Sequence, residues 1–459
     1  MTAEDIIEEV CSREIAVQCD RFVIDGIPIY YYVRRSLFEK YYDQNGFAFK
    51  YSSPRTSRLE KRRSYFISFF QILWLLLTKY NITNFVYSFY RTDRINGLYV
   101  DKFTDPLIDF SNLGKSFIVF EIGRQGHHNK PRIHSDKIIY ADSINKICSI
   151  YANNCRDRYY LKNKGVFDSL FGAIEQVFPG LDYNRNSIVK TVLQKRAITN
   201  TYRLIFKRLG IKAFFAPSRN DFQHIIPAAK QCNIPVYELQ HGVTKGKSMT
   251  YSGQRNLMFT PDFFLAFGNL SVTDNYGIDT NKIRVIGWAF NSYIDGMIDE
   301  ADKKDSNAVL FVGEPIDVEK QINVCLKLAK EYPQIDFYYR AHPGCVVSSD
   351  SLIGLSGVKN VIIDDNSQNI LVTLNHFSQI VGISSTVLCE ASSKGKKVGM
   401  LYIDGLRPLS LNGHENDYFW EIRDVESFGL FLHASSNEKK RMNIYSEFNR
   451  RLFEELILQ

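Results

Sequence analysis

The sequence contains eight cysteines but has no C-x-x-C pair. Cysteines at that spacing are typical of zinc and redox centres, so this chain lacks the commonest arrangement of both. The cysteines lie mostly in apolar stretches, at positions 11, 19, 148, 155, 232, 325, 345 and 389. Such usage indicates buried, reduced thiols and a cytoplasmic protein.

The first twenty residues, MTAEDIIEEVCSREIAVQCD, lack the basic start and apolar centre of a signal peptide. Acidic residues stand where a secretory signal would carry lysine or arginine. We therefore expect the protein to remain in the cytoplasm.

No apolar run reaches the roughly 20 residues that a helix needs to cross a bilayer. The longest, YFISFFQILWLLL at 65–77, has helical spacing and follows the basic segment RTSRLEKRR at 55–63. One interpretation is a core helix preceded by a solvated basic turn. The other is an interfacial helix in peripheral contact with the inner membrane. Its apolar face would comprise Phe66, Phe69, Phe70, Leu73, Trp74 and Leu77.

Signatures of nucleic-acid binding are also missing, since no RNP, KH or zinc-finger pattern occurs. The net charge of +7 favours anionic ligands or an anionic surface, and we predict no nucleic-acid partner. With 45% hydrophobic and 23% charged residues, the composition is that of a globular protein rather than a disordered one.

The phosphate-binding patterns G-x-G-x-x-G and G-x-x-x-x-G-K-[ST] are absent, which argues against the standard dinucleotide and P-loop sites. Short apolar runs alternate with helical segments in two series, as buried parallel strands do. The first series occupies 116–123, 211–217, 234–242, 263–268 and 283–287. The second occupies 308–313, 335–344, 360–365, 378–383 and 397–402.

Two such series predict an α/β protein with two Rossmann-like domains facing a central cleft. At 459 residues the chain is long enough for two cores. The expected parts are a mainly helical region at 1–100 packed on the first domain, an N-terminal domain at 101–295 and a C-terminal domain at 305–430. A final helix at 431–459 could cross back to the N-terminal domain. Ligands of open α/β sheets bind beyond the carboxyl ends of the strands, so the residues there are the site candidates.

The stretch FYYRAHPG places two nitrogen-bearing side chains at one strand end. In an extended strand, the side chains of Arg340 and His342 project to the same side, and Pro343 ends the hydrogen-bond ladder of the strand. Guanidinium and imidazole N–H groups suit a phosphate oxygen. The alternative is an ordinary loop histidine satisfied by backbone carbonyls.

Forty residues later, GISSTVLCEASSKG presents three hydroxyls at the start of a helix. Ser384, Ser385 and Thr386, with the free backbone N–H groups of that turn, would form an anion site, although one hydroxyl alone would be a simple cap. Glu390, one turn further, could accept ribose hydroxyls or pair with a lysine. Glu314, which follows the first strand of this domain, is a minor candidate.

AHPG followed by GISST resembles the HP and Ser-Ser/Thr motifs of bacterial GT-B glycosyltransferases that use CMP-activated sugars. These are the sialyltransferase-like and capsule-type Kdo transferases. The resemblance covers mainly 308–402, and QHG at 240–242 is similar to a segment of capsule-biosynthesis proteins. It implies the GT-B fold and implies that His342 and the three hydroxyls hold the nucleotide phosphate. The acidic D/E-D/E-G motif of the sialyltransferase-like enzymes is absent, which leaves the donor sugar and the base open.

The strand ends of the N-terminal domain supply the candidates for the other side of the cleft. Glycosyl transfer needs a base for the acceptor hydroxyl or a carboxylate nucleophile. The available groups are His241, Glu238, Glu121 and Asp221. The cations that could hold an acceptor or a donor carboxylate are Arg124, Arg219, Lys245 and Lys247. The polar segment 91–109 could line the acceptor side or be a solvated loop.

These patterns lead to the prediction of a glycosyltransferase that moves an ulosonic acid such as Kdo from a CMP donor to a capsule or O-antigen glycan. Its expected partners are a nucleotide-sugar donor and a glycan or lipid-linked glycan acceptor. We expect no metal or other cofactor, since Asp364-Asp365 is the only acidic pair near a strand end. The alternatives are a CDP-alcohol phosphotransferase of teichoic-acid-like polymer synthesis and a non-catalytic glycan-binding protein.

Overall fold

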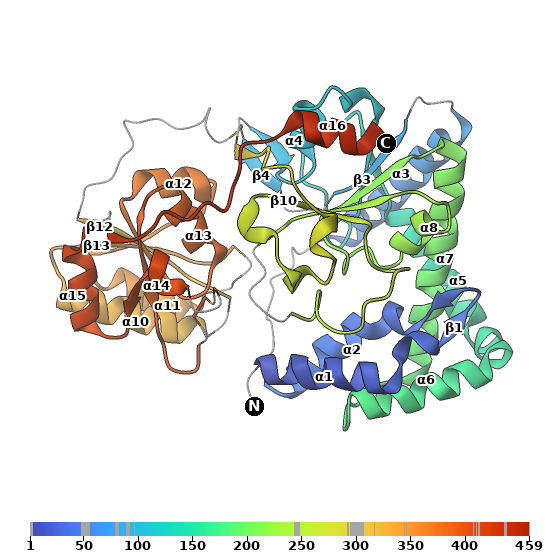
Figure 1. Ribbon diagram of the computed structural model, residues 1–459, viewed down its shortest axis with the longest axis horizontal. Helices are drawn as coiled ribbons and strands as arrows, with labels where there is room; N and C mark the ends of the chain where they lie inside the picture. The colour runs from blue at the N-terminus through green and yellow to red at the C-terminus, as the bar shows by residue number, and fades with distance from the viewer. Residues whose placement is uncertain are drawn as a thin grey trace.

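The computed structural model contains two α/β domains and a set of N-terminal helices (Figure 1). It describes residues 3–46, 56–78, 82–88, 92–95, 97–242, 248–291, 293, 307–315, 317–343, 345, 347–406, 408–409, 411, 414–435 and 438–458. The predicted fold class is confirmed, because both domains are built on parallel sheets and the chain opens with a helical segment.

The N-terminal sheet has the strand order β11-β10-β9-β8-β3-β6-β7, and all of its pairs are parallel. Its strands are β3 (Asn84–Tyr87), β6 (Phe117–Glu121), β7 (Ile138–Tyr140), β8 (Ala213–Ala216), β9 (Val236–Leu239), β10 (Phe263–Ala266) and β11 (Ile283–Val285). The five predicted strands are present. β3 and β7 were not predicted, and β3 lies inside the sheet, between β8 and β6, although its residues fall within the stretch expected to be mainly helical.

Helices cover one face of this sheet, and their apolar side chains pack on Phe85, Phe120 and Phe214. They are α3 (Arg58–Leu77), α5 (Asp142–Lys162), α7 (Arg185–Leu209) and α8 (Ile226–Lys230). The opposite face packs on α4 (Asp105–Asp109) and on the C-terminal helix. Between β3 and α4 the chain forms the antiparallel hairpin of β4 (Thr92–Ile95) and β5 (Leu98–Asp101).

The N-terminal helices form a separate core with the start of α7. They are α1 (Ala3–Val17), α2 (Tyr30–Gln44) and α6 (Lys164–Val177), and the small hairpin of β1 (Val23–Ile24) and β2 (Ile27–Pro28) joins the first two. The buried Arg34 joins this core to the first domain, because it pairs with Glu14 at 2.6 Å and donates to the carbonyls of Met249 and Ser252.

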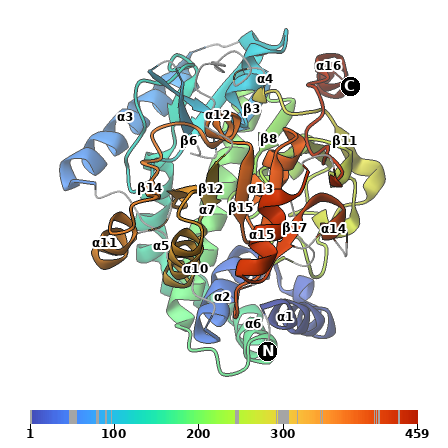
Figure 2. The ribbon, with the colours of Figure 1, turned by 90° about the vertical axis from the view of Figure 1, so that its left-hand side faces the viewer.

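The C-terminal sheet has the order β14-β13-β12-β15-β16-β17 and is also parallel throughout (Figure 2, in which this domain faces the viewer). Its strands are β12 (Ala308–Val312), β13 (Asp336–Arg340), β14 (Val361–Ile363), β15 (Gln379–Gly382), β16 (Lys397–Leu401) and β17 (Trp420–Ile422). The first five match the predicted series. One face packs on α10 (Val318–Glu331), α11 (Ser349–Ser356) and α15 (Val425–His433), and the other packs on α12 (Ile370–His376) and α13 (Thr386–Ser393). The short α14 (Glu415–Tyr418) precedes β17.

The chain then returns to the first domain, where α16 (Arg450–Leu458) packs Phe453 on Phe215 (Figure 1). Segment 442–449 runs against the ends of β10 and β11, with Ser446 N donating to Phe267 O and Asn449 N to Ile286 O, both at 2.7 Å. At Gly287 a Cβ atom would lie 2.1 Å from the carbonyl oxygen of Glu447, so only glycine permits this approach. One apolar core therefore extends through both domains.

Helix α3 contradicts the interpretation of 65–77 as a core helix. Its six apolar face residues, from Phe66 to Leu77, are each 41–74% exposed. Within the part of the chain that the structure describes, no helix is both long and apolar enough to cross a membrane. No disulfide joins the eight cysteines, all of which are among the described residues.

Candidate functional site

Three of the residues predicted to bind the donor nucleotide follow neighbouring strands at the carboxyl edge of the C-terminal sheet. β12 lies between β13 and β15, so the strand order reverses there, and Val312 is in register with both Arg340 and Gly382. His342 follows β13, Glu314 follows β12 and Ser384 follows β15. Such a reversal point opens the crevice in which α/β proteins bind ligands.

Ser384 already holds an anion, the carboxylate of Glu314. The backbone N–H of Ser384 donates to Glu314 Oε1, and the Ser384 hydroxyl donates to Glu314 Oε2 at 2.5 Å. Ser385 is the N-cap of α13, where its Oγ accepts from Val387 N. Thr386 is the first residue of that helix and is half-buried. The three hydroxyls therefore differ in role, since one binds an anion and one caps.

Arg340 is turned into its own domain. Its Nη1 donates to Asp364 Oδ1 at 2.9 Å and to the Thr373 hydroxyl at 3.0 Å, and its Nη2 donates to the Gln368 carbonyl at 2.6 Å. The residue is only 5% exposed. This guanidinium fixes the loop after β14, while His342 and the exposed Pro343 continue beyond the strand.

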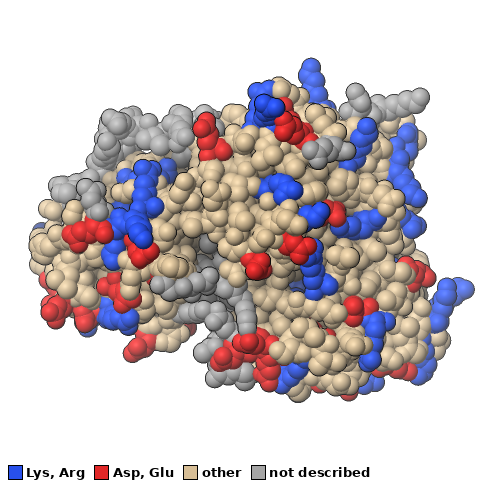
Figure 3. Space-filling model, viewed as in Figure 1, with Lys and Arg blue, Asp and Glu red and all other residues tan. Residues whose placement is uncertain are grey.

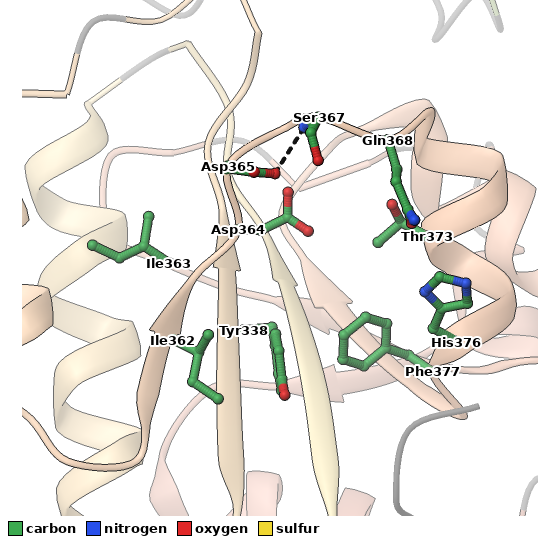
Figure 4. Close-up of a pocket in the computed structure, with 10 residues that line it drawn as sticks. All are labelled: Tyr338, Ile362, Ile363, Asp364, Asp365, Ser367, Gln368, Thr373, His376 and Phe377. Atoms are coloured by element: carbon green, nitrogen blue, oxygen red, sulfur yellow. Dashed lines mark hydrogen bonds between the residues drawn. The ribbon is translucent and has the colours of Figure 1, made fainter. Parts of the chain in front are cut away.

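A pocket of about 350 Å³ lies beside that loop, between the edge of the sheet and α12 (Figure 4). Tyr338 and Ile362 form its floor, and its polar lining includes Asp364, Asp365 and His376. Asp365 accepts from the backbone N–H of Ser367, and hydrogen bonds from the side chain and then the backbone of Ser367 hold the pKa of that carboxyl below its ordinary value. The acidic pair is thus used in loop structure.

Glu390 faces the boundary between the two domains. Burial raises the pKa of its carboxyl, while Lys102 of the first domain acts in the opposite direction. The Tyr445 hydroxyl, from the returning C-terminal segment, donates to Glu390 Oε1 at 2.8 Å. Asp93, in hairpin β4–β5, lies near Asn369 of the second domain, and burial raises the pKa of its carboxyl. The hairpin therefore reaches the C-terminal domain.

At the end of β9 in the first domain, Glu238 and Arg219 form a buried pair. Arg219 Nε donates to Glu238 Oε2 at 2.7 Å, and Arg219 N donates to Oε1 at 3.0 Å. The Tyr251 hydroxyl donates to Oε1 at 3.3 Å, and its ring stacks under the guanidinium. Glu238 is 0% exposed and Arg219 7%, so the predicted base and the predicted acceptor cation bind each other.

Glu121 belongs to a second buried network, which the sequence did not reveal. The ring nitrogens of His128 contact two carboxylates, with Nδ1 2.7 Å from Glu121 Oε1 and Nε2 2.9 Å from Asp142 Oδ2. Arg132 pairs with Glu121 and lies 3.4 Å from Asp105 Oδ2. The only sequence signals were the polar density of 91–109 and the pair of histidines at 127–128. With Glu121 fully buried, this cluster supports the sheet edge from within.

Two titratable side chains of this network, those of His128 and Asp105, have raised pKa values. Burial by itself lowers the pKa of His128, but hydrogen bonds with Asp142 and Glu121 raise it above the ordinary value. Burial raises the pKa of Asp105 to about 7, against the opposing effect of Arg132. Asp105 is fully buried and accepts from the backbone N–H of Asp101 at 2.6 Å.

Because of Asp105, the free energy of unfolding should fall as pH rises from about 4 to 7. Because its folded pKa is raised, the folded state keeps this proton between about pH 4 and 7, where an unfolded aspartate has lost it. The stabilisation is present below pH 4 and is lost as pH rises toward 7. We expect the free energy of unfolding of the wild type to decline over this range relative to Asp105→Asn, measured by urea titration at each pH. Parallel curves for the two proteins would contradict the assignment.

The other N-terminal candidates occupy different environments. His241 is half-buried in the turn after β9, beside the buried Gln240, whose amide donates to Gly242 O. Asp221 pairs with Arg35 of α2 at 2.5 Å. Arg124 is exposed in the turn after β6. Lys245 and Lys247 lie outside the described residues.

Among the described residues, no set of three or more His, Cys, Asp or Glu side chains is arranged to hold a metal ion. Metal independence remains a prediction.

Comparison with known proteins shows similarity to solved structures only. The sequence matches no protein-family model and no curated protein. The UDP-GlcNAc 2-epimerase of Methanocaldococcus jannaschii is 12% identical, with a TM-score of 0.48 over 82% of this chain and 99% of that one. The Neisseria meningitidis enzyme of the same name, bound to UDP-GlcNAc, is 13% identical, with a TM-score of 0.48 over 82% of this chain and 99% of that one. The wall teichoic acid polymerase TagF gives 12% identity and a TM-score of 0.40 over 88% and 98%.

Proposed function

We propose that the protein is a glycosyltransferase that moves an ulosonic acid such as Kdo from a CMP-activated donor to a bacterial surface glycan. One observation carries the proposal: the Ser384 N–H and hydroxyl converge on a carboxylate at the reversal point of the C-terminal sheet. Phosphate oxygens need the same donors, and the N-terminus of α13 adds favourable electrostatics. The motif resemblance of His342 and the three hydroxyls supports the CMP donor.

In this proposal the donor phosphate binds between His342 and the start of α13. Ser384 and Thr386 donate to its oxygens, and Ser385 keeps the helix end in place. Arg340 acts as a positioning residue, because its three hydrogen bonds fix the loop beside His342. Glu390, at the domain boundary, would accept hydrogen bonds from ribose hydroxyls once the Tyr445 hydroxyl leaves its carboxylate.

The acceptor hydroxyl has to lose a proton as the sugar is transferred. His241 is the strongest base candidate, because Glu238 and Glu121 are already bound in buried ion pairs. Arg124, with Lys245 and Lys247, would hold an anionic acceptor or the donor carboxylate. The resulting reaction consumes a nucleotide sugar and a glycan or lipid-linked glycan in the cytoplasm, and requires no metal ion.

A thermal-shift screen of the wild type against CMP, CDP, UDP and GDP tests the nucleotide class. A ligand that binds only the folded state raises the melting temperature by mass action, by an amount set by its concentration relative to Kd. We expect CMP and CDP to raise Tm more than UDP and GDP do. A larger shift with UDP would replace the CMP assignment, and no shift with any nucleotide would favour a glycan-binding protein.

Product release then separates the reactions. Incubation with CMP-Kdo, CDP-glycerol or UDP-GlcNAc and a glycan acceptor should release CMP from the first donor only, and His342→Ala should reduce that release at least about a hundredfold. His433→Ala is the matched control, since His433 is exposed at the end of α15, beside the amino end of β16, where Lys397 bonds the carbonyls of Leu432 and Ala434. Release of CMP from CDP-glycerol would identify a phosphotransferase instead. Equal rates for wild type and His342→Ala would refute the proposed site.

A further inference from the structure

Helix α3 buries Ser64 and Ser68 together with Leu75, and it exposes most of its aromatic side chains. Ser68 Oγ donates to Tyr140 O at 2.6 Å, and Gln71 bonds both the Ile138 carbonyl at 3.2 Å and the Tyr140 N–H at 2.9 Å. Ser64 Oγ lies 3.1 Å from His128 Nε2. These bonds attach the helix to the edge strand β7 and fix its rotation about its own axis.

The fixed rotation turns an aromatic face outward. The exposed fractions are 66% for Phe66, 59% for Trp74 and 74% for Leu77, and the remaining members Phe69, Phe70 and Leu73 are 41–49% exposed. The rings of Phe66, Phe69 and Phe70 also contact one another, with centroids 4.6 and 5.6 Å apart. A surface helix normally buries such a face, so this orientation indicates a site that meets an apolar medium.

Positive charge flanks this face at the start of the helix. Arg58, Arg62 and Arg63 are exposed, Lys61 is half-buried beside them, and the only acidic residue of the helix, Glu60, is held in the capping box with Ser57. Figure 3 shows Lys and Arg side chains along the right-hand edge, where Figure 1 places α3 and α7. Helix α5, which packs on α3, exposes Ile147, Ile150 and Tyr151 as well.

We propose that α3 docks the protein on an anionic lipid bilayer, lying in the plane of the interface. Its aromatic and leucine side chains enter the boundary between headgroups and acyl chains, and its basic turn contacts lipid phosphates. The 20 residues of α3 extend about 30 Å along the surface. Charge selects this occupant over a second copy of the chain, because a copy would present the same basic turn and the same net charge of +7. The inference is independent of the proposed enzymatic activity.

Vesicle co-sedimentation of the full chain tests the docking. We expect binding to phosphatidylcholine vesicles with about one third phosphatidylglycerol, weak binding to pure phosphatidylcholine, and a loss in about 0.5 M salt. Phe70→Ser/Trp74→Ser should lower partitioning at least about tenfold. Arg62→Gln/Arg63→Gln should weaken binding to the anionic vesicles only. Leu257→Ser/Leu430→Ser is the control, because both leucines are exposed, at 72% and 69%, and lie away from α3.

Tryptophan fluorescence gives a second readout. Trp288 is buried and Trp420 partly buried, so Trp74 should dominate any blue shift on vesicle addition. Trp74→Phe should remove the shift while leaving sedimentation with vesicles nearly unchanged. Equal partitioning of the Phe70→Ser/Trp74→Ser variant and the wild type would overturn the proposal. A lipid-independent dimer that this variant abolishes, without vesicle binding by the wild type, would overturn it in favour of a second copy.

Discussion

Replacing Glu238 by alanine should lower the free energy of unfolding by about 3–5 kcal/mol. The variant leaves the Arg219 guanidinium, which is 7% exposed, in the same place without its carboxylate. Arg219 N and the Tyr251 hydroxyl also lose their acceptor. Urea unfolding should show the loss as a lower midpoint with an unchanged slope.

The double variant Glu238→Leu/Arg219→Met separates charge burial from packing. It removes both charges and keeps apolar volume, so it should recover most of the stability that the single variant loses. A double variant as unstable as Glu238→Ala would show that the loss comes from packing. If Glu238→Ala is as stable as the wild type, the pair does not exist in solution, and Glu238 returns as a candidate base.

Ser384→Ala and Glu314→Ala should change CMP affinity in opposite directions. If the donor phosphate takes the position that the Glu314 carboxylate now holds, the Ser384 hydroxyl contributes a hydrogen bond to a charged group. Such bonds contribute about 1.5–3 kcal/mol, which corresponds to a Kd raised at least about tenfold in Ser384→Ala. Removing Glu314 frees the site of a competing anion, so Glu314→Ala should bind CMP more tightly than the wild type.

Calorimetric titration with CMP measures both effects. Ser393→Ala is the control, because its hydroxyl bonds the Glu390 carbonyl at the other end of α13. Weaker binding by Glu314→Ala would mean that this carboxylate contacts the nucleotide and does not compete with it. Unchanged affinity in Ser384→Ala would remove the anion site from the proposed function, whatever the protein's activity.

Much of the fold could be predicted because a buried parallel strand appears in sequence as a short apolar run. β12, β13 and β15 follow this rule, and each carries a residue of the candidate site just past its end. β3 did not stand out, because its four residues are followed by a polar segment and precede a hairpin of mixed charge. The predicted meeting of His342, Glu314 and Ser384 at one edge followed from strand parallelism alone.

The partners of the charged residues could not be predicted. Glu238 and Arg219 meet because β8 and β9 are neighbours with Ala216 opposite Glu238, and a strand order is not encoded in any local period. For the same reason the sequence alone predicts Glu121 as a candidate catalytic group, although strand β7 and the turn after β6 enclose it with His128 and Arg132.

By itself, the sequence determined the kinds of element, their order and the chemical groups at each strand end, because periodicity and composition are local properties. Only the tertiary structure decided which of these groups remain available. It neutralised Glu238, Arg219 and Glu121 in buried pairs and gave Ser384 an internal anion. It also turned the apolar face of α3 outward, because Ser68 and Gln71 found backbone partners on β7. Hydrogen bonds between segments far apart in the sequence determine these arrangements, and local sequence patterns do not predict such bonds.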